Sequence, residues 1–175
     1  KSLNLDTKTF DPRTVMSMIS RAKDKLMTPR QFRADAAGDY FREKVAEVYQ
    51  LYEKEMKKAC ALDFDDIIMK TVLLLQSNPD VLEYYQRKFR YVLVDEYQDT
   101  NYAQYVLTSL LAGYYENICV VGDDDQSIYK FRGATITNIL EFEKQFKDAK
   151  TIRLEQNYRS TGNILNAANE VIRNN

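Results

Sequence analysis

Three short runs of β-forming residues each lead into a cluster of polar side chains. Helical patterns separate the runs, so the strands are expected to lie parallel in one sheet, joined by right-handed crossovers. Ligands of such sheets bind beyond the carboxyl ends of the strands, where the three clusters would meet in one site. The runs and the clusters that follow them are residues 91–94 before 95–100, residues 118–121 before 122–126, and residues 151–154 before 155–159.

The first cluster opens with an Asp-Glu pair, Asp95 and Glu96, directly after an apolar run, which is the pattern of a Walker B element. An aspartate at a strand tip can hold Mg²⁺ through the water ligands of the ion. The adjacent glutamate, pointing the other way, can orient and deprotonate the water that attacks a γ-phosphate. An acidic pair also occurs commonly as a solvated strand end, and that is the alternative for Asp95 and Glu96.

The second cluster continues into alternating aromatic and cationic side chains, Tyr129, Lys130, Phe131 and Arg132. Nucleic-acid bases can stack on such rings while the backbone phosphates meet the positive charge. A stacked base contributes roughly 1–3 kcal/mol, more than an isolated phosphate contact, so Phe131 is expected to matter more than Lys130. The alternative is that Phe131 packs into the core beneath the Gly-Ala turn at residues 133–134.

The elements that position these residues are mainly helical. Cap-proline dipeptides at residues 11–12 and 28–29 predict two helix starts, and a third helix over residues 39–59 carries an aromatic and methionine stripe that we interpret as core. Asp63 is expected to cap a fourth helix, whose first turn holds the aspartates at 65 and 66 because the helix dipole favours negative charge there. Further helices are predicted after residue 79 and over residues 102–111, 136–146 and 161–172.

The chain of 175 residues has 45% hydrophobic residues, enough for one domain with a core, and a net charge of −1. That charge is unevenly distributed. Residues 1–60 carry 13 Lys+Arg against 9 Asp+Glu, whereas residues 61–175 carry 12 against 17. This asymmetry indicates two surfaces with different partners, although solvated helix faces are usually charged without having any partner.

The chain has two cysteines, no histidine, no signal peptide and no long apolar run. These features indicate a reducing, cytoplasmic compartment without a membrane association, and they disfavour a zinc site. Cys119 lies in the second β-rich run, where we expect a buried free thiol. The chain begins at Lys1 rather than at a methionine and ends abruptly at Asn175, so both ends are expected to be cut from a longer protein.

Three longer strings extend the polar clusters: VDEYQDT at residues 94–100, VGDDDQSIYKFRGA at residues 121–134 and LEQNYRS at residues 154–160. In order and spacing they resemble motifs II, III and IV of the superfamily 1 DNA helicases of the UvrD/Rep/PcrA group, and the similarity is closest to the PcrA type. The segment at residues 62–66 resembles one that these helicases carry shortly before motif II. The resemblance covers essentially the whole chain.

The resemblance implies an α/β fold, with a partial RecA-like (P-loop NTPase) parallel sheet and an all-helical insertion. Residues 1–60 would be part of the insertion, and residues 61–175 the later part of the first RecA-like domain. The implied activity is that of an ATP-dependent DNA helicase, which couples Mg-ATP hydrolysis to movement on single-stranded DNA. The implied partners are single-stranded and duplex DNA and a second RecA-like domain of the same protein.

The resemblance also implies a role for each matching residue. Asp95 coordinates Mg²⁺, Glu96 is the general base, Gln126 senses the γ-phosphate and links it to DNA contact, and Arg159 contacts the γ-phosphate as an arginine-finger-type group. A guanidinium that faces carboxylates and a metal is stable when an anion such as phosphate intervenes. The alternative for Arg159 is a salt bridge to Asp95 or Glu96. Family members usually carry tryptophan where this chain has Phe131, which keeps the stacking face with less area.

No Gly-x-x-x-x-Gly-Lys-Ser/Thr loop occurs in the chain, so it holds no cradle for the β- and γ-phosphates. We therefore expect this chain by itself to bind ATP weakly or not at all and not to unwind DNA. One alternative is a non-catalytic DNA-binding module, which the basic residues 1–60 and the strip at 129–132 support. Another is a two-metal nuclease, which would need the aspartates of residues 63–66 to converge with Asp95.

Overall fold

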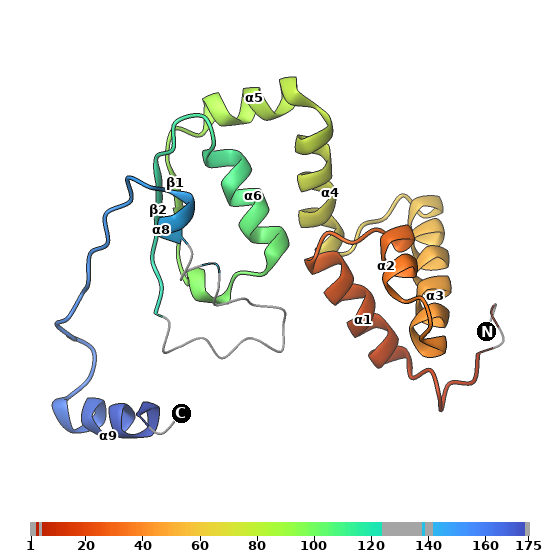
Figure 1. Ribbon diagram of the computed structural model, residues 1–175, viewed down its shortest axis with the longest axis horizontal. Coiled ribbons are helices and arrows are strands. Elements are labelled where there is room, and N and C mark those ends of the chain that lie inside the picture. Colours follow the sequence, from red (N-terminus) through yellow and green to blue (C-terminus); the bar gives the residue numbers. More distant parts are fainter. Residues whose placement is uncertain (1–2, 4, 124–137, 139–141, 174–175) are drawn as a thin grey trace.

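The computed structural model describes residues 3, 5–123, 138 and 142–173. It is rich in helices and contains a small parallel sheet, as in part of an α/β domain. In Figure 1 the first three helices gather at one end, α4 stands in the middle, and α5, α6 and the strands lie beyond it. The helices are α1 (Pro12–Asp24), α2 (Pro29–Asp35), α3 (Tyr40–Lys58), α4 (Phe64–Ser77), α5 (Pro79–Lys88), α6 (Tyr102–Ala112), α8 (Phe142–Gln145) and α9 (Gly162–Ile172).

The predicted helix starts are confirmed by their caps. The side chain of Asp11 accepts a hydrogen bond from the N–H of Thr14 at 2.9 Å, and proline follows the cap at the first helical position. Thr28 begins α2 with a capping box, in which its hydroxyl and the side chain of Gln31 each bind the other's backbone N–H. These local hydrogen bonds depend only on residues three apart, which is why the sequence could predict them.

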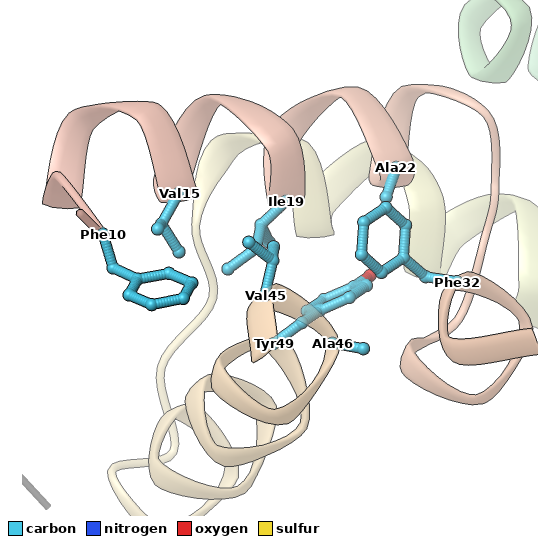
Figure 2. Close-up of a cluster of buried hydrophobic side chains, with 8 residues drawn as sticks. All are labelled: Phe10, Val15, Ile19, Ala22, Phe32, Val45, Ala46 and Tyr49. Carbon is cyan, nitrogen blue, oxygen red and sulfur yellow. The ribbon is translucent and has the colours of Figure 1, made fainter. Parts of the chain in front are cut away.

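A hydrophobic core joins α1, α2 and α3 (Figure 2). The predicted stripe on α3 is confirmed in part, because Val45 and Tyr49 are buried whereas Tyr40 is 68% exposed. The Tyr49 hydroxyl donates a hydrogen bond to the carbonyl of Met27 at 3.1 Å, so this buried phenol is satisfied. The buried members of the core are Phe10, Val15, Ile19, Ala22, Phe32, Val45, Ala46 and Tyr49.

Strands β1 (Val92–Val94) and β2 (Ile118–Val120) pair in parallel, with Val92 opposite Ile118, as predicted. Helix α6 packs against β1, and half-buried positions alternate along each strand with exposed ones. One face of the strands is uncovered, because Leu93 is 78% exposed although it lies in an apolar run. The expected burial of the Cys119 thiol is wrong for the same reason, since Cys119 pairs with Leu93 and is exposed with it.

The third predicted strand, residues 151–154, is not a strand in this structure. Its apolar side chains Ile152 and Leu154 are 81% and 86% exposed, and the segment extends away from the sheet toward α9 (Figure 1). Strand stability comes from hydrogen bonds and side-chain pairs with a neighbouring strand. In the described part of the chain the sheet has two strands, and neither of them pairs with this segment.

Helix α8 lies against α6 and the 3₁₀ turn that follows β1. The ring of Phe142 packs edge to face on Tyr97, and the hydroxyl of Tyr105 in α6 donates a hydrogen bond to Gln145 at 2.8 Å. The helix predicted over residues 136–146 is therefore confirmed where the structure describes it, at Phe142–Gln145. None of the helices that the structure describes combines the length and the apolar character needed to cross a membrane.

Lys23 joins three helices through buried ion pairs. Its Nζ lies 3.0 Å from Glu53 in α3, and 2.7 Å from Asp63 and 2.9 Å from Asp66 at the start of α4. Lys70 adds a second cation, 3.1 Å from Asp66 and 3.3 Å from Glu53. Desolvation lowers the pKa of Lys23, but its hydrogen bonds to Asp63, Asp66 and Glu53 outweigh burial and raise that pKa above its ordinary value. We call these five residues the Lys23 cluster.

The next residue, Asp24, ties α1 to the helix that follows the first acidic cluster. Its Oδ1 accepts a hydrogen bond of 2.6 Å from Nδ2 of Asn101, the residue that caps α6. Burial, and then the nearby charge of Asp65, raise the pKa of Asp24 to about 6. Two consecutive residues at the end of α1 therefore fix α3, α4 and the start of α6 relative to one another.

The Asp24→Asn variant is expected to be more stable than the unaltered chain at pH 8, by on the order of 1–2 kcal/mol. The folded-state pKa of Asp24, about 6, lies above the ordinary value of 3.8, so its ionised form is disfavoured by folding. The unaltered chain accordingly loses stability as the pH rises through about 6, whereas asparagine keeps an oxygen for Asn101 and carries no charge. Urea denaturation followed by circular dichroism at pH 4, 6 and 8 measures the difference.

The stability advantage of Asp24→Asn should disappear near pH 4, because Asp24 is then protonated in the folded chain and is neutral like the asparagine. Asp148→Asn is the matched control, since Asp148 is exposed, and it should leave stability unchanged at each pH. An Asp24→Asn difference that is equal at pH 4 and pH 8 would show that the buried charge is not its cause.

Candidate functional site

The carboxyl ends of β1 and β2 lie side by side, so the first two polar clusters meet as predicted. The N–H of Val121 donates to the carbonyl of Val94 at 2.8 Å, and the N–H of Tyr97 donates to the carbonyl of Val121 at 2.9 Å. These bonds continue the ladder one step past the strands, to where Asp95 and Glu96 follow β1 and Asp123 follows β2. The predicted proximity of the first two clusters is therefore confirmed as far as Asp123, the last residue of the second cluster that the structure describes before a gap.

Glu96 has a left-handed backbone, with φ 50° and ψ 43°. A residue with a β-carbon occupies this region at a cost of roughly 1–2 kcal/mol, and such residues concentrate at functional sites. The N–H of Glu96 donates to Oδ1 of Asp95 at 2.9 Å, which stabilises the turn. Both carboxylates are exposed, and each accepts a hydrogen bond from a different partner, Asp95 from the N–H of Glu96 and Glu96 from the Gln98 amide.

The turn that follows Glu96 is anchored in the core. Tyr97 is fully buried, and burial raises the pKa of its phenol to about 12. The hydroxyl of Thr100 donates to the carbonyl of Tyr97 at 2.7 Å, and Nδ2 of Asn138 donates to the carbonyl of Thr100 at 3.2 Å. The acidic pair therefore directly precedes a 3₁₀ turn, Tyr97–Asp99, that is anchored in the core.

Gln98 is a site residue to which the sequence assigned no role. Its side chain is buried, Nε2 donates to Oε2 of Glu96 at 2.8 Å, and Oε1 accepts from the N–H of Asp123 at 3.1 Å. Gln98 thus connects the two acidic clusters. Its position two residues after Glu96 was visible in the sequence, but its inward direction depends on the left-handed residue before the turn.

Five of the predicted site residues lie outside the residues that the structure describes. They include the predicted γ-phosphate sensor and the whole aromatic and cationic strip. Their roles, and the alternative core position for the phenylalanine, therefore stay predictions. These residues are Gln126, Tyr129, Lys130, Phe131 and Arg132.

Arg159 is described, and the structure does not bring it to the acidic pair. Its side chain is exposed, and its backbone N–H donates to Oδ1 of Asn157 at 2.8 Å in a local turn. Among the described residues Arg159 forms no ion pair with Asp95 or Glu96, so the alternative salt bridge is not observed. The arginine follows the segment that forms no strand, which is why it is placed away from the sheet edge.

The aspartates of residues 63–66 belong to a helix start, as one interpretation predicted. Asp63 and Asp66 form a capping box at the start of α4, and both bind Lys23. Their oxygens are therefore already engaged by the helix start and by the Lys23 cluster. In the described ranges, no three His, Cys, Asp or Glu side chains gather in a way that could hold a metal ion.

The Lys23 cluster was missed by the sequence interpretation, although one feature could have indicated it. Val15 and Ile19 lie on the buried face of α1, and Lys23 follows Ile19 by four residues on that same face. A lysine on a buried face must be paired, because burial of an isolated ammonium is strongly unfavourable. The sequence could thus have predicted a buried ion pair, but not which carboxylates form it.

Comparisons with known proteins cover the whole chain. A family model described as the UvrD/REP helicase N-terminal domain matches residues 1–147. The protein named ATP-dependent DNA helicase PcrA of Bacillus subtilis strain 168 is 57% identical over all 175 residues, which make up 24% of that protein. Proteins of the same name from Staphylococcus aureus strain Mu50 and from Staphylococcus epidermidis are 57% and 56% identical over the same share. The chain spans about a quarter of the length of these curated relatives.

Proposed function

The chain belongs to the UvrD/REP helicase N-terminal domain family, and we propose that it is part of an ATP-dependent DNA helicase. Residues 1–60 form part of a helical insertion, and residues 61–175 form the later part of the first RecA-like domain. A second RecA-like domain lies elsewhere in the complete protein, and closure between the two domains drives movement along single-stranded DNA. The identity of 57% with proteins named PcrA over the full chain supports this proposal.

The observation that carries the proposal is the acidic pair at the shared edge of two parallel strands. Asp95 is exposed, and one of its oxygens accepts the N–H of Glu96, which leaves the other for a water ligand of Mg²⁺. Glu96 accepts the proton of the attacking water, because its carboxylate is exposed and held in place by Gln98. When bound, Mg-ATP supplies the γ-phosphate bond that is hydrolysed.

The remaining roles rest on the motif resemblance. Gln126 and Arg159 contact the γ-phosphate, and the strip from Tyr129 to Arg132 contacts single-stranded DNA, with Phe131 as the stacking residue. Arg159 takes this role once the exposed segment before it pairs as a strand in the complete sheet. The phosphate-binding loop is supplied by a part of the protein outside this chain, since no such loop occurs in these 175 residues.

A calorimetric titration of this chain with Mg-ATP is expected to show no saturable binding in the micromolar range. The chain has side chains for the metal and the attacking water but no loop to hold the β- and γ-phosphates. The full-length protein, by contrast, should hydrolyse ATP and should do so faster when single-stranded DNA is added. Micromolar, Mg²⁺-dependent ATP binding by this chain alone would contradict the assignment of the phosphate site to another segment.

DNA-binding and ATPase assays of the full-length protein distinguish the non-catalytic alternative, which the basic residues 1–60 favour. A DNA-binding module would bind single strands in a salt-dependent manner without any nucleotide. If the full-length protein binds DNA in this way and hydrolyses no ATP with or without DNA, the motor proposal is wrong and the module is the better account.

A further inference from the structure

The side chain of Gln98 bridges the two acidic clusters of the site. It is 1% exposed. Its Nε2 donates a hydrogen bond of 2.8 Å to Oε2 of Glu96, and its Oε1 accepts one of 3.1 Å from the N–H of Asp123. We propose that Gln98 is a positioning residue, which holds the Glu96 carboxylate in register with the loop that follows β2. This inference rests on the proposed function, in which Glu96 is the general base.

The two hydrogen bonds fix the orientation of the Gln98 amide. A flipped amide would set its NH₂ group against the N–H of Asp123 and its carbonyl against the carboxylate of Glu96. The backbone next to Gln98 is fixed as well. Its neighbour Tyr97 is fully buried, and the N–H of Tyr97 donates to the carbonyl of Val121. A rigid donor is therefore presented to a carboxylate that is otherwise exposed.

Positioning matters at Glu96 because a glutamate side chain has several freely rotating bonds when it is exposed. Ordering such a side chain costs up to about 2 kcal/mol, and misplacing a catalytic group by about 1 Å can cost a hundredfold in rate. The amide of Gln98 engages only Oε2 of Glu96. Oε1 therefore remains available to accept the proton of a water molecule.

The chemistry of the bridge requires a neutral amide of this length. Glutamate at position 98 would set one carboxylate against that of Glu96, and lysine would offer no acceptor to the N–H of Asp123. A methionine would fill the same buried volume and make neither hydrogen bond. Gln98→Met is therefore the variant that removes the bridge while keeping the packing of the turn.

The bridge also makes the position of Glu96 depend on the loop after β2. Asp123 lies in that loop, three residues before Gln126, the predicted γ-phosphate sensor. A displacement of Asp123 would therefore move the Gln98 side chain, and with it the donor that holds the Glu96 carboxylate. Gln98 thereby couples the position of Asp123, in the second cluster, to the orientation of the Glu96 carboxylate in the first.

The test compares Gln98→Met with the unaltered full-length protein in steady-state ATPase assays. The variant should lose about 10–100-fold in kcat, the same range as when a residue that orients a metal ligand is removed. KM for ATP should stay within about twofold, because the Gln98 side chain is buried and already bound to Glu96 and Asp123. The stimulation by single-stranded DNA should fall toward one. Gln86→Met is the matched control, since Gln86 donates a 2.7 Å hydrogen bond to the carbonyl of Leu110 away from the site.

A kcat within twofold of the unaltered protein would overturn the proposal, as would parallel losses in kcat, KM and stability that Gln86→Met reproduces. A measurement on this chain keeps the bridge testable without any catalysis. In ¹⁵N NMR spectra, Glu96→Ala should shift the side-chain amide of Gln98 and the backbone amide of Asp123, and leave the side-chain amide of Gln86 in place.

The two experiments separate two kinds of failure. If Glu96→Ala moves neither amide, the bridge is absent and the inference is wrong, whatever the protein catalyses. If the amides move but the unaltered full-length protein hydrolyses no ATP, the bridge is real, and it is the proposed function that fails.

Discussion

The Lys23→Met variant is expected to lose about 3–5 kcal/mol of unfolding free energy relative to the unaltered chain. Methionine replaces the aliphatic stem but removes the ammonium that lies within 3.0 Å of Glu53, Asp63 and Asp66. Lys70 is then the remaining cation of the Lys23 cluster, and its side chain is 41% exposed. Asp66 then stays buried with only the more exposed Lys70 beside it, and Asp63 loses its cation. The expected loss is a large share of the 5–15 kcal/mol typical of a domain.

Urea denaturation followed by circular dichroism measures this loss, with Lys44→Met as the matched control. Lys44 pairs with Glu47 three residues away on the surface of α3, so its replacement should cost less than about 1 kcal/mol. The difference between the two variants should shrink as the pH falls. Burial acts to raise the pKa of Asp63, but hydrogen bonds from Lys23, the N–H of Asp66 and Tyr52 together lower it below its ordinary value. The stability that Asp63 contributes is therefore lost on acidification. Equal losses for the two variants would mean that the buried cluster does not stabilise the fold.

The helices of this chain could be predicted because their determinants are local. Asp11, Thr28 and Asp63 each bind a backbone N–H three residues later, and the helices begin where these caps predict. The Lys23 cluster is the opposite case. Lys23 and Asp66 are 43 residues apart, and the periodicity of α1 shows that position 23 is buried without showing what meets it.

The strand predictions were right for the two strands that pair with each other and wrong for residues 151–154, which pair with no strand in the described residues. Strands β1 and β2 pair with each other, so their apolar runs were sufficient. Residues 151–154 have the same β-forming character, yet Ile152 and Leu154 remain exposed because strand formation depends on a neighbour. The exposed position of Leu93 has a related cause, since Leu93 and Cys119 lie on a face of this small sheet that the described residues leave open.

The site was predictable to the extent that strand ends determine it. Asp95 and Glu96 lie where an acidic pair after an apolar strand should lie, next to the loop that begins with Gly122 and Asp123. Gln98 could not be predicted in the same way. Its inward direction follows from the left-handed backbone of Glu96 and the turn after it, and a left-handed glutamate has no marker in the sequence.

In the full-length protein, Glu96→Gln is expected to lower kcat for ATP hydrolysis by 10²–10⁴-fold, or about 3–5.5 kcal/mol of transition-state stabilisation. The amide keeps the shape of the side chain and an oxygen that can accept from Nε2 of Gln98, so the turn should stay intact. What it loses is the basicity needed to take a proton from the attacking water. ATP binding should change only a few-fold, because the variant leaves Asp95, the proposed metal-binding carboxylate, in place.

Glu116→Gln is a control matched in both chemistry and backbone. Glu116 is an exposed glutamate with φ 53°, close to the 50° of Glu96, but it precedes β2 at the opposite end of the strands. Single-turnover hydrolysis and nucleotide binding measured for both variants separate the chemical step from affinity. If Glu96→Gln retains more than a tenth of the unaltered rate, another group must take the proton, and the left-handed turn then only shapes the strand end. If only Glu96→Gln loses the chemical step, that loss must come from the position of Glu96 at the carboxyl end of β1, because a left-handed glutamate elsewhere tolerates the same change.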